Sequence, residues 1–227
     1  MSGSEPSLVF DLDGTLIDSV PQVRWAMNRV LADKGLRPLT LAEVTALVGG
    51  GARAMFDAAF AMLEYSCDEN TMSGILDRYL EAYLENPKAN TVIYPHAMDV
   101  LAAFRSQGIP MGICTNKPGR TTRAVLDALG LGPFFSAVVT ADDVAHRKPD
   151  GRHVLDTLSA MGVGPEGAFM IGDSEVDIAA GKNADIKTIA VTWGYCHVPI
   201  GELLADGMVD SFAEIPERIK ALHGSAE

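Results

Sequence analysis

Residues 7–15 read Ser-Leu-Val-Phe-Asp-Leu-Asp-Gly-Thr, a short apolar run that leads into two aspartates separated by one residue. A run of this length, bounded by acidic residues and a glycine, is typical of a buried strand that ends in a functional loop. We therefore expect a strand over residues 7–11, with Asp11 and Asp13 at its carboxyl end.

The next part of the chain, from about residue 20 to residue 86, has the spacing of helices. Its clearest signal is an apolar set at i, i+1, i+4, i+5 and i+8: Met55, Phe56, Ala59, Phe60 and Leu63. Such spacing predicts an amphipathic helix. Thr40 and Glu43 have the separation of a capping box, which predicts a helix start at that point. We find no convincing strand in this region.

Beyond Asn86 and Pro87 the pattern alternates between strands and helices. Strands are expected near residues 110–115, 137–140, 168–172, 187–192 and 208–209. Helices are expected near residues 96–107, 125–129, 154–161 and 177–183, and Ser211 with Glu214 resembles a capping box that opens the last one. This alternation predicts an α/β fold, a Rossmann-like parallel sheet with helices on both faces. Residues 1–16 and 89–227 would form the core domain, and residues 17–88 an inserted α-helical cap.

Composition narrows the function classes. The 227 residues include 18 Lys+Arg and 30 Asp+Glu, a net charge of −12, which disfavours nucleic-acid partners and anionic membrane surfaces. The three cysteines are far apart and predict neither a disulfide framework nor a metal knuckle. The N-terminus has no basic segment followed by an apolar one, and no apolar run reaches the roughly 18 residues of a membrane span. We expect a cytoplasmic protein.

Four short polar segments stand at the ends of predicted strands. They are Asp11-Leu12-Asp13-Gly14-Thr15, Thr115-Asn116-Lys117, Lys148-Pro149, and Gly172-Asp173-Ser174 with Asp177. Each alone is common in ordinary turns and helix caps. Because the carboxyl ends of parallel strands meet at one crevice, their joint occurrence predicts a single site.

The residue types in these segments fit phosphoryl transfer. Several carboxylates in one small volume need a compensating cation, and hard oxygen ligands shared with a substrate phosphate suit Mg²⁺. Lys148 adds a positive charge, and Thr115, Asn116 and the loop amides after Asp13 add hydrogen-bond donors. A carboxylate beside such cations can attack phosphorus, and a second carboxylate two residues later can protonate the leaving oxygen.

With these four motifs, the sequence resembles the haloacid dehalogenase superfamily of phosphatases over nearly its whole length. The resemblance implies that Asp11 is the nucleophile and Asp13 the general acid/base. It also implies that the phosphoryl group is held by Thr115, Asn116 and Lys148. Mg²⁺ would be held by the Asp11 carboxylate, the Asp13 main-chain carbonyl and Asp173, with Asp177 assisting through water or a hydrogen bond, while Thr15 would support the loop.

Within this superfamily the sequence is similar to the phosphoglycolate phosphatases. The similarity lies in the loop Val48-Gly49-Gly50-Gly51-Ala52-Arg53 and in the stretch 191–195, Val-Thr-Trp-Gly-Tyr. It implies that Gly50 and Arg53 contact the substrate, which would be 2-phosphoglycolate, with Arg53 pairing with its carboxylate. The same loop also fits a helix–helix turn that carries a solvent-exposed arginine.

Two positions depart from the family pattern. Gly151 stands where relatives often have a second proline, so the following helix could start differently. Asp185 stands where a glycine is usual, and an aspartate there would adopt the left-handed conformation at some cost in stability.

Other functions remain open at this point. The substrate could be another small phosphate, and a sugar-phosphate mutase of the same superfamily fits the same motifs. Outside enzymes, a phosphoacceptor signalling module also combines acidic residues, Mg²⁺, threonine and lysine. The expected partner is a small phosphomonoester, and both a monomer and a homodimer are compatible with the sequence.

Overall fold

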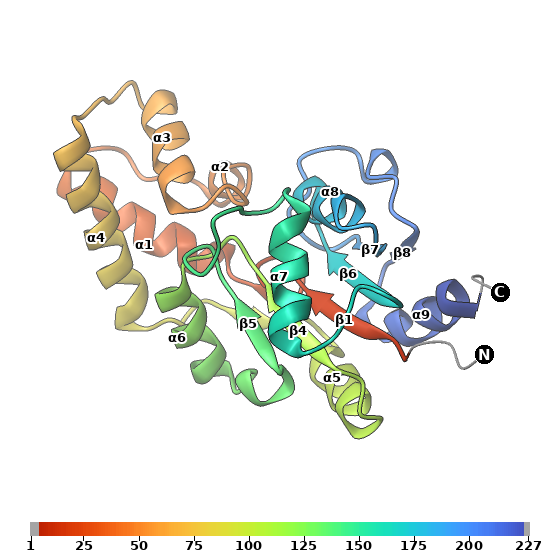
Figure 1. The fold of residues 1–227 in the computed structure, drawn as a ribbon. Coiled ribbons are helices and arrows are strands. Elements are labelled where there is room, and N and C mark those ends of the chain that lie inside the picture. Colours follow the sequence, from red (N-terminus) through yellow and green to blue (C-terminus); the bar gives the residue numbers. More distant parts are fainter. Residues whose placement is uncertain (1–4, 225–227) are drawn as a thin grey trace.

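The computed structural model describes residues 5–224 and contains one parallel six-stranded sheet (Figure 1). The strand order is β5-β4-β1-β6-β7-β8 and every neighbouring pair is parallel. The strands are β1 (Ser7–Phe10), β4 (Met111–Cys114), β5 (Ala137–Val139), β6 (Ala168–Gly172), β7 (Lys187–Val191) and β8 (Gly207–Val209). The first strand of the chain is therefore central, although the next strand of the sheet follows about a hundred residues later.

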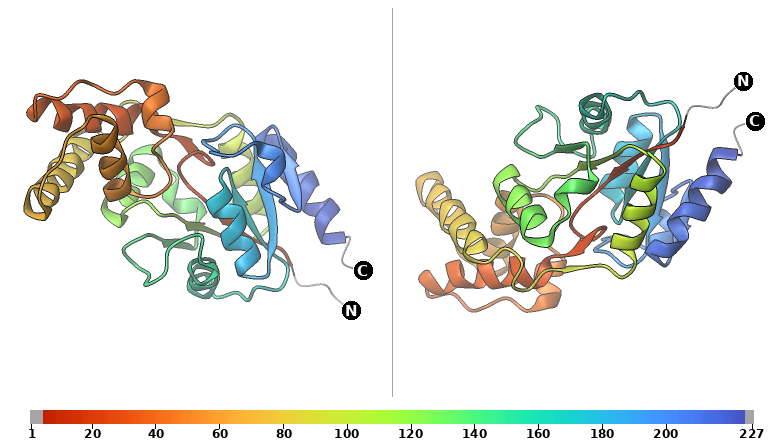
Figure 2. Two further views of the ribbon diagram at one scale, coloured as in Figure 1. Left: turned by 90° about the horizontal axis from the view of Figure 1, so that it is seen from above. Right: turned by 90° about the horizontal axis from the view of Figure 1, so that it is seen from below.

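Helices cover both faces of this sheet (Figure 2). Leu8 and Phe10 of β1 pack into one buried cluster and Val9 into another, as the two-residue period of a strand requires. The first cluster is shared with α5 (Ala97–Ser106), α6 (Gly119–Leu129) and α9 (Ile215–His223), and the second with α7 (Gly151–Met161) and α8 (Glu175–Asn183). The α/β prediction is confirmed, including the helices on both faces.

Along the chain, four helices follow the first strand before the sheet continues with β4. They form a separate group with a buried hydrophobic cluster of their own (Figure 1). They are α1 (Val20–Asp33), α2 (Leu41–Thr45), α3 (Ala52–Met62) and α4 (Glu69–Glu85). The capping box of Thr40 and Glu43 opens α2, as expected. The proposed domain boundary at residues 17–88 stays a prediction.

A two-stranded antiparallel ribbon, missed in the sequence, joins these helices to the sheet. The strand β2 (Ile17–Asp18) pairs with β3 (Val92–Ile93) where the chain leaves the core and where it returns. Two-residue strands have no detectable period, so their pairing depends on the surrounding structure. The ribbon fixes the two connections side by side.

The prediction for the last helix was wrong at its start. Ser211 opens a short 3₁₀ turn, Phe212–Glu214, and its hydroxyl accepts a hydrogen bond from the amide of Ala213. The helix α9 begins only at Ile215. Pro216 explains this start, because its fixed φ and missing N–H suit the first turn of a helix.

Both departures from the family pattern are accommodated. Asp185 lies just after α8 with a φ of 56°, the left-handed conformation that we expected. The helix α7 starts at Gly151. Asp150, the residue before it, caps the helix, because its side chain accepts a hydrogen bond from the amide of Arg152. The remaining helical turns of the described chain are the 3₁₀ segments Gly132–Phe134 and Ile200–Glu202.

Replacing Gly151 with alanine is expected to lower the free energy of unfolding by about 1–3 kcal/mol, the usual cost of overpacking. A Cβ at Gly151 would lie 2.4 Å from the carbonyl carbon of Asn183 and 2.5 Å from the nitrogen of Ala184, so two backbones would have to separate. Chemical denaturation of both proteins measures the change. Gly74→Ala is the matched control, because alanine favours the interior of α4 and a Cβ at Gly74 would meet no heavy atom of residues 5–224 within 4 Å, apart from the adjacent backbone of its own helix. Equal stability of the two variants would contradict this account of the packing between α7 and α8.

Candidate active site

The site lies where three adjacent strands of the sheet, β4, β1 and β6, end. Because β1 pairs with both β4 and β6, Asp11, Thr115 and Asp173, each the residue after its strand, emerge side by side. The loop between β5 and α7 brings Lys148 to the same place. These residues line one pocket, together with residues of the helical block.

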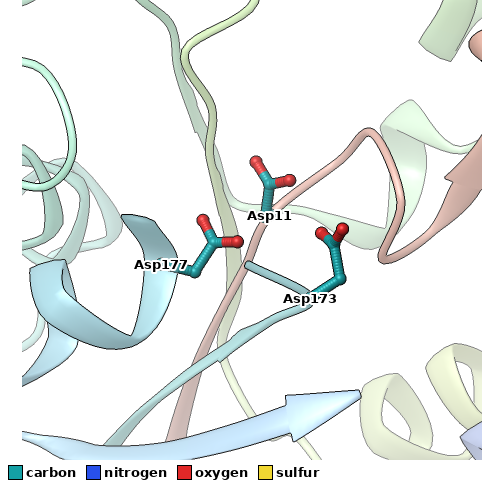
Figure 3. A group of neighbouring side chains, drawn as sticks. All are labelled: Asp11, Asp173 and Asp177. Atoms are coloured by element: carbon teal, nitrogen blue, oxygen red, sulfur yellow. The ribbon is translucent and has the colours of Figure 1, made fainter. Parts of the chain in front are cut away.

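Three carboxylates meet in this pocket (Figure 3). Asp11 follows β1, Asp173 follows β6, and Asp177 lies in the first turn of α8. One oxygen from each lies within 4.8 Å of the other two, and all three residues are buried. The three carboxylate groups lie close to one another at neighbouring ends of their elements (Figure 3). The sequence-predicted convergence of these segments is thus present in the structure.

Lys148 is held between two of these carboxylates. Its Nζ donates hydrogen bonds of 2.6 Å to Asp11 and 2.6 Å to Asp177, and only 5% of the residue is exposed. Burial by itself lowers the pKa of the ammonium, but the two carboxylates outweigh burial and raise it. Lys148 therefore stays charged, as a group that binds phosphoryl oxygens must.

The positive charge near the buried carboxylates does not balance their negative charge. Burial raises the pKa of Asp11 to about 7, because Lys148 offsets only part of the desolvation and Asp177 adds repulsion. Burial also raises the pKa of Asp173 well above its usual range, and Asp177 and Asp11 raise it further. Both raised pKa values indicate that several carboxylates are buried close together, away from solvent.

A divalent cation fits this imbalance. Four carboxylates line this part of the pocket against two buried ammonium groups: Asp11, Asp13, Asp173 and Asp177 against Lys117 and Lys148. When all are ionised, two negative charges remain. Hard oxygen ligands of this kind are those that Mg²⁺ prefers, and the converging oxygens of the buried triad supply them.

Asp13 faces a different part of the pocket from the triad. Its carboxylate accepts hydrogen bonds from Nζ of Lys117, at 3.0 and 3.1 Å, and from the hydroxyl of Ser19. The loop can turn here because Gly14 has a φ of 89°, and a Cβ at this position would lie 2.3 Å from Oδ2 of Asp173. Asp11 and Asp13 therefore share one loop but have different partners.

Asp173 is fixed by neighbours on both sides. The hydroxyl of Thr15 donates a hydrogen bond of 3.0 Å to its Oδ1, and the amide of Tyr195 donates one of 2.7 Å to its Oδ2. Thr15 thus contacts the acidic triad, in keeping with a supporting role. The hydroxyl of Tyr195 donates to Asp18 at 2.6 Å and accepts from the amide of Ser19, which ties the loop after β7 to the start of α1.

The two other predicted phosphate-binding residues lie in the loop after β4. Thr115 is buried, and its hydroxyl accepts a hydrogen bond from the amide of Lys117. The Nδ2 group of Asn116 donates to the carbonyl of Lys148 at 3.0 Å. Both residues line the pocket. The hydrogen bond from Asn116 also joins this loop to the one that carries Lys148.

The predicted specificity loop reaches the pocket only in part. Gly49, Gly51 and Ala52 line it, whereas Gly50 and Arg53 are exposed and do not. Arg53 is already paired, at 2.6 Å with Glu69 and at 3.0 Å with Asp57. This geometry favours the alternative of a turn with a surface arginine, because residues after the turn follow the helical rotation of α3.

Sequence reasoning missed two basic side chains of the pocket. It assigned Lys117 no role beyond following Thr115 and Asn116. In the structure Lys117 is buried, with only 8% of the residue exposed, and its ammonium donates a hydrogen bond to Asp13. His197 lies at the rim, where it pairs with Glu175 at 3.2 Å. Lys117 directly follows Thr115 and Asn116 at the end of a predicted strand, and this position could have indicated that it belongs to the pocket. His197 lies in an irregular loop, where the sequence has no such indication.

With this geometry in hand, comparison with known proteins identifies the family. The family model described as haloacid dehalogenase-like hydrolase matches residues 8–191, most of the chain. This chain belongs to that family. It is a haloacid dehalogenase-like hydrolase whose acidic triad, Lys148 and Thr115 all fall within the matched residues.

Relatives within the haloacid dehalogenase-like hydrolases are similar along nearly the entire chain. A phosphoglycolate phosphatase of Agrobacterium fabrum is 38% identical, covering 92% of this chain and 90% of the relative. One from Caulobacter vibrioides is 36% identical, covering 93% and 89%. The crystal structure of a predicted phosphoglycolate phosphatase from Haemophilus somnus 129PT superimposes with a TM-score of 0.87 at 28% identity, covering 93% and 96%.

Membrane insertion through a helix finds no support within residues 5–224. None of the helices there combines the length and the apolar character that crossing a bilayer requires.

Proposed function

We propose that this protein hydrolyses a small phosphomonoester, 2-phosphoglycolate, with Mg²⁺ as cofactor and an aspartyl-phosphate on Asp11 as intermediate. The observation that carries the proposal is the buried triad of carboxylates with Lys148 held between two of them. Family membership supports hydrolysis, and the name shared by relatives at 36–38% identity supports the phosphomonoester and the particular substrate.

In the first step, a carboxylate oxygen of Asp11 attacks phosphorus and forms a new P–O bond. The bond between phosphorus and the leaving oxygen breaks, and that oxygen takes a proton from the carboxyl group of Asp13. The structure supports this division of work because Asp11 lies among the triad, while Asp13 lies on the same loop with separate partners. The products are glycolate and the aspartyl-phosphate.

In the second step, water attacks the phosphorus of the aspartyl-phosphate. Asp13, now a carboxylate, accepts a proton from this water as its oxygen bonds to phosphorus. The P–O bond to Asp11 breaks, the Asp11 carboxylate is restored, and inorganic phosphate leaves. Asp13 is again protonated, so the cycle closes with one water consumed.

The remaining residues bind and neutralise charge. Lys148, Thr115 and Asn116 would hold the phosphoryl oxygens through their donors. The Asp11 carboxylate, the Asp13 carbonyl and Asp173 would hold Mg²⁺, with Asp177 assisting through water or a hydrogen bond. When bound, Mg²⁺ would offset the charge of the carboxylates and of the phosphoryl oxygens and so allow two anions to approach each other.

The helical block 17–88 would act as a cap that excludes water from the first step. Val48, Gly49 and Met55 line the pocket opposite the strand ends, which supports this role. Asn116 donates a long hydrogen bond of 3.5 Å to the carbonyl of Gly49, a direct link between the two parts.

Removing divalent metal is expected to lower phosphate release from 2-phosphoglycolate by at least about 100-fold, because the triad would then repel the substrate phosphate. Phosphate release is measured after treatment with EDTA and dialysis, and again after addition of MgCl₂, which should restore it. Ca²⁺, which prefers more ligands and longer bonds, should restore much less. Full activity in the metal-free protein would contradict the assignment of the triad.

A panel of small phosphomonoesters tests the substrate. 2-Phosphoglycolate is expected to have a kcat/KM among the highest, measured with Mg²⁺ at equal ionic strength. A poor value for 2-phosphoglycolate with good values for other esters would overturn the substrate and leave the phosphatase. Conversion of a sugar phosphate into an isomer without free phosphate would favour a mutase, and a long-lived aspartyl-phosphate would favour a signalling module.

A further inference from the structure

The pocket contains two buried ammonium groups, and the reaction proposed above uses only one. Lys148 lies among the carboxylates of the triad, on the side where the phosphoryl group would bind. Lys117 comes from the loop after β4 and lies 3.0 Å from Oδ1 of Asp13. Burying an ammonium group is costly, so its presence in a binding pocket needs a reason.

Lys117 lies where the sheet domain meets the helical block. Its Nζ is 4.6 Å from the centre of the Tyr83 ring, a side chain of α4, and Tyr79 of the same helix lines the pocket beside it. The ammonium thus contacts both the carboxylate of Asp13 and the ring face of Tyr83. Because Asp13 is the proposed general acid for the leaving oxygen, its partner Lys117 would lie near the leaving group.

The distances place Lys117 within reach of a group attached to the leaving oxygen. A general acid must lie about 2.6–3.2 Å from the oxygen that it protonates. Nζ of Lys117 contacts the carboxylate of Asp13, the proposed general acid, at 3.0 and 3.1 Å. Nζ would therefore lie within about 6 Å of the leaving oxygen that Asp13 protonates. In 2-phosphoglycolate the carboxylate carbon is two bonds from the leaving oxygen, a span of about 2.5 Å. The substrate carboxylate can therefore reach Nζ.

The other basic side chains at or near the pocket are less well placed for that role. Arg53 is exposed, paired with two carboxylates and outside the pocket. His197 lines the rim and is paired with Glu175. Among the described residues that line the pocket, Lys117 is therefore the cation best placed to receive a carboxylate on the leaving group.

We propose that Lys117 is the residue that selects an acidic leaving group, by donating a charged hydrogen bond to the carboxylate of the substrate. The proposal rests on the function proposed above. An ammonium has three donors, so Nζ can serve Asp13 and the substrate together. Sites built around a buried charge discriminate strongly against analogues that lack its partner.

The test compares two esters that differ in this one group. 2-Phosphoglycolate carries the carboxylate, and 2-hydroxyethyl phosphate carries a neutral alcohol in its place. For each, kcat/KM is measured with Mg²⁺ in the unaltered protein and in Lys117→Met, and the readout is the ratio between the two esters. A loss of Asp13 positioning would lower both values alike and cancel in the ratio.

We expect the unaltered protein to prefer 2-phosphoglycolate, and Lys117→Met to lower that preference by about 30-fold to 1000-fold, the loss usual when one partner of a buried charged hydrogen bond is removed. Lys117→Gln keeps a donor without the charge and should lose most of the preference, which provides a second reading if the methionine variant is unstable. Arg53→Met, a matched loss of a cation near the same pocket, should keep the ratio.

Each contrary outcome has a separate meaning. If 2-hydroxyethyl phosphate is hydrolysed and 2-phosphoglycolate is not, the proposed substrate fails. If 2-phosphoglycolate is preferred but both Lys117 variants keep the ratio, the substrate stands and the role of Lys117 is overturned. A collapse of the ratio in Arg53→Met with retention in the Lys117 variants would return the role to Arg53.

Discussion

Asp11→Asn is expected to release no measurable phosphate, a fall in kcat of at least about 10⁴-fold, as is usual when a nucleophile is removed. The amide oxygen does not attack phosphorus, and no other carboxylate of the triad occupies the same position at the end of β1. The change is nearly isosteric, so the protein should fold; Lys148 keeps its hydrogen bond to Asp177. Phosphate release with Mg²⁺ and 2-phosphoglycolate measures the effect.

Trapping the intermediate makes this test specific. Acid quenching during turnover, followed by mass spectrometry of peptides, should find a phosphate on Asp11 in the unaltered protein and none in Asp11→Asn. Asp127→Asn, the same change at an exposed position of α6, should keep both the activity and the phosphorylated peptide. Phosphate release by Asp11→Asn within tenfold of the unaltered protein would exclude Asp11 as the nucleophile.

Lys148→Met is expected to lower kcat/KM by about 10²-fold to 10³-fold, the usual loss when a preorganised charged donor is removed from a transition state. It should also destabilise the protein, because Asp11 and Asp177 would remain buried without their cation, which typically costs about 3–5 kcal/mol. Activity is therefore measured at a temperature at which circular dichroism shows the variant to be folded.

Stability and activity separate the two roles of Lys148. Mg²⁺ should recover part of the lost stability, since it offsets the same charges, whereas it should not restore kcat/KM. Lys182→Met, which removes an exposed lysine from α8, is the control and should change neither quantity by much. If Lys148→Met kept its kcat/KM, the lysine would be only a structural counter-ion.

The sequence predicted the sheet well because the relevant signals are local. Buried parallel strands such as 168–172 are short apolar runs, and that range matches β6 residue for residue. Helices of the block 20–86 repeat their apolar residues every three or four positions, which is visible without any tertiary contact. The two-residue strands β2 and β3 have no such repeat, and only their mutual pairing creates them.

For the site, the sequence by itself determined which residue types follow which strands, and a parallel sheet then requires Asp11, Thr115 and Asp173 to meet. It did not determine which way a side chain turns within a loop or after a helix start. The ammonium of Lys117 is buried against Asp13 and the Tyr83 ring, whereas the side chain of Arg53 is exposed and pairs with Glu69. These directions depend on ion pairs and packing between segments far apart in the chain, so only the tertiary structure could decide them.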